Sequence, residues 1–132
     1  NDNSRPVLLL EAQAALALAP AGVSADPTLQ QRASDLQTWV ATHPLDSLAW
    51  TALSQIQERL GQPLRAIRAD AESRVALGDL TGAADRLRGG QRRARGGGSG
   101  AVDFIDASVI DARLRDVEIQ RRQREADLKQ FR

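Results

Sequence analysis

Two short stretches share one pattern: residues 60–66 read LGQPLRA and residues 77–83 read LGDLTGA. Each begins with Leu-Gly and ends with an alanine, and the second lies 17 residues after the first. Glycine after an apolar residue is typical of a helix C-terminus, and the Pro or Asp that soon follows is typical of the next helix start. The recurrence therefore predicts helices of similar length that meet at tight turns.

The same signals extend this row of helices in both directions. Pro or Asp opens most segments, and Gly or the His43-Pro44 pair closes them. Apolar residues recur at intervals of three or four within the segments, as on the buried face of a helix. The sequence predicts helices over 6–19, 27–42, 46–60, 63–77 and 80–95, a glycine-rich break at 96–100, and a last helix from 101 onward. Two Phe, two Trp and no Tyr leave little material for a β-sandwich core.

The last two helices carry more particular expectations. We expect the interior pair Gly89-Gly90 to weaken its helix by about 1 kcal/mol per Gly relative to Ala. The last helix has enough apolar residues for a buried first half, whereas residues 119–127 are almost wholly polar and should be solvated. The apolar residues of that first half are Val102, Ile105, Val109, Ile110, Ala112, Leu114 and Val117.

The spacing of 17 residues is half of the 34-residue tetratricopeptide repeat, a pair of antiparallel helices. Residues 46–79 resemble this repeat. Positions that the repeat uses for helix packing and turns are occupied here by Trp50, Leu53, Gly61, Ala66, Gly78, Ala83 and Leu87. Pro44 lies where a preceding repeat would end, but Gln57 and Asp70 stand at positions that are usually aromatic.

This resemblance implies an all-α, tetratricopeptide-like stack of antiparallel helix pairs, an α-solenoid, with a long C-terminal helix. We expect one helical-repeat domain over 1–132. Its parts are a degenerate helix pair at 6–43, the best-supported repeat at 46–79, a further helix at 80–95, the break at 96–100 and the C-terminal helix at 101–132.

The second half of the chain also resembles a narrower group. The Ala71-Glu72 pair, the Gly78-Asp79 turn and the ending Asp103-Phe104 followed by residues 110–114 (IDARL) look like the C-terminal region of periplasmic zinc metallopeptidases with an HExxH motif, of the β-barrel assembly-enhancing kind. The resemblance implies a periplasmic location and a parent protease that acts on envelope proteins. Because the chain contains no Met, we expect it to be part of a longer polypeptide whose catalytic domain lies elsewhere.

The residues themselves give little support for catalysis. The chain has one His and no Cys, so neither a zinc site nor a Ser-His-Asp triad can be assembled from the usual groups. We interpret His43 as a solvated helix-end residue, and the carboxylates of Asp103, Asp106 and Asp111 as surface charge. We therefore predict that this chain is not an enzyme, binds no metal and needs no cofactor. The longest apolar stretch is too short to cross a membrane.

The charge is unevenly distributed. Residues 1–85 hold six Arg and ten acidic residues, a net charge of −4, whereas residues 86–132 hold twelve basic and seven acidic residues, a net charge of +5. A basic stretch on the fifth helix suggests RNA or anion binding as one alternative function, through Arg86, Arg88, Arg92, Arg93 and Arg95. No aromatic residue lies among them to stack on a base, which disfavours nucleic acid. Charges paired with acids of a neighbouring helix are the simpler interpretation.

Helical repeats expose a concave surface, which favours a protein or peptide partner. If residue 47 begins the repeat, the third helix directs one strip of side chains toward that surface. This strip consists of Leu48, Thr51, Gln55, Glu58 and Arg59. Two alternatives remain: the last helix folds back over the strip, or it forms a homodimer through Leu128 and Phe131. We predict a non-catalytic protein–protein interaction module.

Overall fold

The computed structural model describes residues 4–19, 26–96 and 101–131. These residues form six helices and no strand, which confirms the all-helical prediction. The helices are α1 (Arg5–Leu18), α2 (Pro27–Thr42), α3 (Ser47–Arg59), α4 (Pro63–Ala76), α5 (Leu80–Gly96) and α6 (Ala101–Gln130). Each boundary that the sequence specified lies within one residue of its predicted position. The break at 96–100 lies outside the described residues except for its first glycine.

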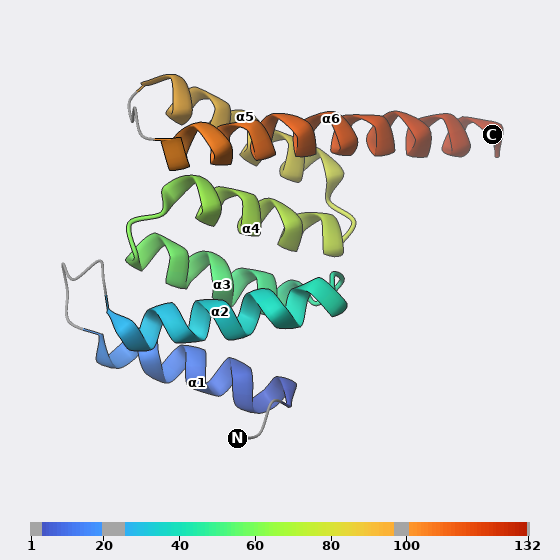
Figure 1. Cartoon of the computed structure of the whole chain (residues 1–132). Helices are drawn as coiled ribbons and strands as arrows, with labels where there is room; N and C mark the ends of the chain where they lie inside the picture. Colours follow the sequence, from blue (N-terminus) through green and yellow to red (C-terminus); the bar gives the residue numbers. More distant parts are fainter. Residues whose placement is uncertain (1–3, 20–25, 97–100, 132) are drawn as a thin grey trace.

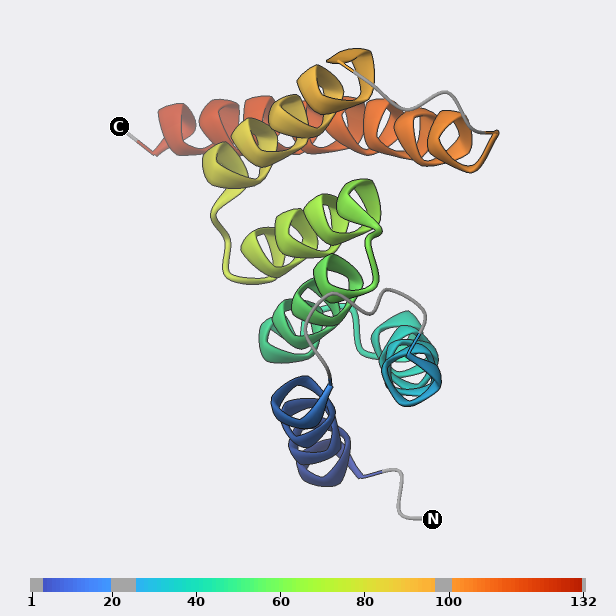
Figure 2. The same cartoon turned by 90° about the vertical axis from the view of Figure 1, so that its left-hand side faces the viewer.

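The helices form a stack with α1 at one end and α5 and α6 at the other (Figure 1). Figure 2 shows α2 beside α3 rather than in line with α1, α3 and α4. In the described part of the chain, α3 packs against α1, α2 and α4, and α6 packs against α4 and α5. Among the described residues, α1 packs on α3 but α3 does not pack on α5, so successive helix pairs do not repeat one arrangement. The fold is a helical stack, and the regular tetratricopeptide geometry stays a prediction.

Aspartate caps and left-handed glycines set the ends of the helices. The carboxylates of Asp26, Asp46 and Asp79 accept hydrogen bonds from the backbone N–H three residues later, at 3.0, 3.2 and 2.8 Å. Each bond satisfies an N–H group that the first turn of a helix leaves without an intrahelical acceptor. Gly61 and Gly78 have φ values of 71° and 82°, where an L side chain is strained. The Leu-Gly recurrence thus marks two equivalent helix ends.

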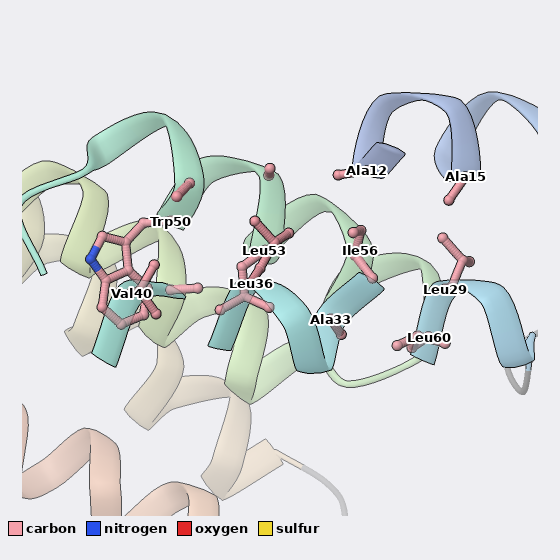
Figure 3. Close-up of a cluster of buried hydrophobic side chains, with 13 residues drawn as sticks. Ala12, Ala15, Leu29, Ala33, Leu36, Val40, Trp50, Leu53, Ile56 and Leu60 are labelled. Atoms are coloured by element: carbon pink, nitrogen blue, oxygen red, sulfur yellow. The ribbon is translucent and has the colours of Figure 1, made fainter. Parts of the chain in front are cut away.

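Two clusters of buried apolar side chains hold the stack together. The first lies among α1, α2 and α3, with Ala69 from α4, and includes Trp50, Leu53 and Ile56, as the strip assignment requires (Figure 3). The second lies among α4, α5 and α6 and includes Leu87. Ala66 and Ala83 are 1% and 0% exposed, so both occupy the close helix contacts that the recurrence predicted.

The buried face of α6 differs from the prediction. Ile110 and Val117 are 1% and 0% exposed, but Ile105 and Val109 are 62% and 39% exposed. Ala112 is exposed as well. The prediction that all of these residues pack inward was therefore wrong. Residues 110, 114 and 117 follow one side of the helix, while 105, 109 and 112 follow another side, roughly 100–160° away at 100° per residue.

The C-terminal half of α6 extends past the rest of the molecule (Figure 1). Residues 122–131 are all exposed, with Leu128 at 60% and Phe131 at 88%. Within the predicted segment 119–127 every residue except Arg121 is exposed, so the expectation of a solvated segment is confirmed apart from Arg121, which is half-buried and pairs with Glu118. This helix contacts only α4 and α5 in the described part of the chain, so it does not fold back over the strip on α3.

Candidate functional site

The strip predicted on α3 divides into outward-facing and internally bonded side chains. Leu48, Gln55 and Glu58 are exposed. Thr51 is half-buried, and its hydroxyl lies 2.9 Å from the Ser73 hydroxyl of α4. The continuous strip is therefore interrupted at its second member.

Arg59 stabilises the end of α1 instead of projecting from the strip. Its guanidinium donates hydrogen bonds to the backbone oxygens of Leu16 and Ala19, at 3.1 and 3.0 Å. A cation at these carbonyls also complements the negative end of the helix dipole. Gln55, Glu58 and Arg59 border a shallow hollow of about 480 Å³ between α1, α3 and α5. Only part of the predicted strip is thus available to a partner.

A larger depression lies on the other side of the stack. We call it the central groove; it has a volume of about 640 Å³ and is bordered by α2, α3, α4 and the first half of α6. Its apolar lining consists of Val40, Ala41, Pro44, Trp50, Leu53, Leu64, Ala69 and Val109. This volume is within the range of pockets that bind small molecules or parts of a peptide. The groove depends on α6 lying opposite α2. Because these two helices are far apart in the chain, no local sequence pattern predicts the groove.

Charged side chains from α4 and α6 form one wall of the central groove. Arg113 donates two hydrogen bonds to Glu72, at 2.7 and 2.8 Å, in a bidentate pair. These bonds raise the pKa of the Arg113 guanidinium above its ordinary value. Arg65 lies 3.3 Å from Asp106. Both carboxylates of this wall are therefore paired with arginines.

Arg68 is the cation of the groove that has the weakest pairing. Its Nε lies 3.8 Å from Glu72, whose two oxygens already accept from Arg113. Its guanidinium carbon lies 5.8 Å from the centre of the Trp50 ring, in a cation–π arrangement. With its side chain 44% exposed, Arg68 can pair with an anionic group that enters the groove.

Gln57 adds an unsatisfied acceptor to the same lining. The residue is 3% exposed and lines the groove, and its Oε1 atom is buried with no hydrogen-bond donor among the described residues. A buried amide oxygen without a donor costs about 1–3 kcal/mol. This residue stands where the repeat usually has an aromatic residue, and the sequence analysis treated it only as a departure from the repeat.

The basic stretch of α5 is not one continuous surface. Arg86 pairs with Asp70 of α4 at 2.9 Å, and Arg88 pairs with Glu118 of α6 and with Asp85. Arg92, Arg93 and Arg95 are exposed. The stretch is therefore divided into two arginines paired with acidic side chains and three exposed arginines.

The groups considered for catalysis or metal binding lie apart. The described residues contain no cluster of three or more His, Cys, Asp or Glu side chains that would suit a metal. The His43 ring stacks on Trp39 with a centroid separation of 3.7 Å. Asp106 pairs with Arg65, and Asp111 accepts a hydrogen bond from Gln91 at 2.8 Å. In the same part of the chain, no helix is long and apolar enough to cross a membrane.

Comparison with known proteins identifies no relative. No protein-family model matches the chain, and neither the curated proteins nor the solved structures contain a significant match. The resemblances to tetratricopeptide repeats and to periplasmic metallopeptidases therefore rest on the sequence patterns given above.

Proposed function

We propose that this chain is a non-catalytic interaction module that binds a segment of another polypeptide in the central groove. The observation that carries the proposal is the chemistry of the groove lining. An apolar lining is combined with the weakly paired cation of Arg68 and with the Arg113–Glu72 and Arg65–Asp106 pairs of the charged wall. Binding sites in proteins commonly combine an apolar surface with a few such polar groups.

The lining specifies what the bound segment should contain. Apolar side chains would pack on Trp50, Leu53 and Leu64 at the bottom of the groove. A carboxylate would pair with Arg68. We therefore expect a short segment with apolar residues next to an Asp or Glu.

The wider role of the module follows from the sequence resemblance. The parent protein would be an exported zinc protease or chaperone in envelope protein quality control, with this region docking its substrate or an assembly partner. Unfolded outer-membrane proteins are the ligands that this role implies. The groove is a more suitable docking surface than the strip on α3, because Thr51 and Arg59 of that strip are bonded internally.

RNA or anion binding by the basic stretch is a weaker candidate. Arg86 and Arg88 are engaged with acidic side chains of α4 and α6, which reduces their attraction for phosphate. No observation on the described residues favours this function over the groove.

The test is selection of ligands from a random peptide library by the whole chain, followed by affinity measurements on variants. Arg68→Glu should lower the affinity for the selected peptides, and for an unfolded outer-membrane protein, by about tenfold or more. The substitution replaces the attraction between Arg68 and a ligand carboxylate by repulsion. Arg92→Glu is the matched control: it makes the same change in charge at an exposed site of α5 and should leave affinity unchanged.

Glu58→Arg reports on the opposite surface. If Glu58→Arg abolishes binding while Arg68→Glu has no effect, the strip on α3 is the site and the groove proposal is wrong. If the library yields no ligand and the unfolded protein does not bind, the chain is not a peptide-binding module.

A further inference from the structure

The walls of the central groove are stripes of helix surface. Along each helix that borders the groove, the lining residues recur mostly at intervals of three or four, as on one side of a helix. On α4 they are Leu64, Arg65, Arg68, Ala69 and Glu72. This stripe extends from residue 64 to residue 72, about 12 Å of helix. The groove is therefore a trough about two helical turns long.

The walls offer few hydrogen-bonding partners to the main chain of a ligand. Within α2, α3, α4 and α6 the backbone N–H and C=O groups bond to one another along each helix, so the groove has no sheet edge. An extended segment would turn backbone groups toward walls that cannot satisfy them, which is unfavourable. A helix bonds its own backbone groups internally and presents only side chains. The walls therefore favour a helical ligand.

Exposed apolar residues lie on both rims of the groove. Ala41 and Pro44 are exposed at the end of α2, and Val109 of α6 is 39% exposed. Figure 2 shows the first half of α6 above α2, with α3 and α4 to the left of α2. Between the rims, the indole N–H of Trp50 donates to the backbone oxygen of Pro44 at 2.8 Å. Because that N–H group is already bonded, the Trp50 ring contributes an apolar surface to the groove.

The charges of the lining favour an acidic ligand. Three arginines and two carboxylates line the groove, which leaves an excess of one positive charge. Asp106 pairs with Arg65, and Glu72 accepts two hydrogen bonds from Arg113, so Arg68 supplies the excess. A carboxylate beside the apolar side chains of the ligand would complement Arg68, whereas a basic segment would be repelled.

We propose that the occupant of the central groove is an acidic amphipathic helix of a partner protein. Its apolar side chains, at positions i, i+3 and i+7, would pack between the two rims, and an Asp or Glu at i+4 would face Arg68. Such a helix would cover Val109, the apolar residue of α6 that the rest of the chain leaves exposed. The inference rests on the proposed function, since it names the conformation and charge of the segment that the groove binds.

Two peptides of about 14 residues and identical composition test the spacing. The helical probe carries Leu at i, i+3 and i+7 and Asp at i+4, with Ala and Gln elsewhere. The alternating probe carries the same Leu residues at i, i+2 and i+4 and Asp at i+6, as an extended ligand would require. By calorimetric titration of the whole chain, the helical probe should bind at least about tenfold more tightly. Equal affinities, a preference for the alternating probe, or no binding of the helical probe would overturn the inference.

A covalent bridge tests the conformation directly. Side chains four residues apart lie about 6 Å from each other on a helix but about 13 Å apart in an extended chain. A Glu–Lys lactam between two outward positions of the helical probe should therefore raise its affinity several-fold, because the helix is then preorganised. If the bridge abolishes binding, the ligand is extended.

Variants of α6 locate the bound helix. Val109→Asp should lower the affinity for the helical probe about tenfold or more, because it places a charge on an apolar rim and opposite the Asp of the ligand. Ile119→Asp is the matched control: Ile119 is an exposed apolar residue of the same helix that does not line the groove. Equal affinities of the two variants would show that the helix does not bind in the groove.

The outcomes for the two proposals are separable. If library peptides bind in a manner that depends on Arg68 but have alternating apolar residues and lose binding when bridged, the groove remains the docking site and its ligand is not a helix. If the helical probe binds but neither Arg68→Glu nor Val109→Asp changes its affinity, both proposals are wrong.

Discussion

Gly90 provides the sharpest test of how α5 is packed. A Cβ atom added at this position would lie 2.9 Å from Cδ1 of Ile110 and 3.0 Å from Cγ2 of Ile67. Gly90 therefore lets α5 approach α4 and α6 closely. Its neighbour Gly89 has more space, because an added Cβ would meet only the Arg92 guanidinium, at 3.6 Å. The two glycines look equivalent in the sequence but differ in their surroundings.

The expected effects of alanine at the two positions can be worked out from these contacts. Replacing an interior helical Gly by Ala raises the free energy of unfolding by about 1 kcal/mol. Gly89→Ala should gain roughly that amount. Gly90→Ala has the same gain, but it also overpacks the contact, which costs about 1–3 kcal/mol. Its net effect should range from neutral to a loss of about 2 kcal/mol, so the two variants should differ by about 1–3 kcal/mol.

Thermal unfolding followed by circular dichroism at helical wavelengths measures this difference. At this chain length 1 kcal/mol corresponds to roughly 3–6 °C, so Gly90→Ala should melt at least about 3 °C below Gly89→Ala. Adding Ile110→Val to Gly90→Ala removes the nearest methyl group and should recover part of the loss. If Gly90→Ala raises the midpoint as much as Gly89→Ala does, the close contact among α4, α5 and α6 is wrong.

Three further predictions concern other parts of the chain. Ala66→Leu should lower the free energy of unfolding by about 1–3 kcal/mol, because Ala66 is 1% exposed where α4 packs against its neighbours; an unchanged urea midpoint would contradict this placement. The hydrogen bond from Arg5 lowers the pKa of Asp46 from 3.8 to about 2. Ionised Asp46 therefore stabilises the fold above pH 4, by an amount on the order of 1 kcal/mol after solvent screening. This contribution should disappear as the pH falls from 4 to 2. Asp46→Asn should remove that part of the acid dependence in unfolding curves measured across this range. Metal analysis of the purified chain should find no tightly bound zinc, and casein should remain uncleaved, because the chain offers one His and no Cys.

The helices were predictable because local signals set them. Asp26, Asp46 and Asp79 act as caps in the structure, and Gly61 and Gly78 adopt the left-handed conformation that ends a helix. These are interactions within three or four residues of the chain, so a single sequence contains all the information that they need.

The buried side of α6 was not predictable in the same way. Ile110 and Val117 lie on one apolar side and Ile105 and Val109 lie on another. Either could cover the body, and the choice is made by contacts with α4 and α5. Gly90 was misjudged for the same reason: its role depends on α6, which follows it across the break in the chain.

The central groove required the three-dimensional arrangement. Glu72 and Arg113, which form its charged wall, are separated by 41 residues, and nothing in their local sequence indicates that they pair. The strip on α3 was derived from an idealised repeat, in which Thr51 and Arg59 face outward. In the structure, Thr51 forms a hydrogen bond with α4 and Arg59 donates a hydrogen bond to α1, because both helices lie close to α3.

The order of contacts along the stack also has a kinetic consequence. In the described part of the chain, no helix packs against another that is more than two positions away in sequence. Such a low contact order favours folding within milliseconds. Among the described residues, α4 is the helix that the two core clusters share: it contributes Ala69 to one and Leu64 and Ile67 to the other. Opening should therefore proceed inward from both ends, and the backbone amides of α3 and α4 should exchange their hydrogens last.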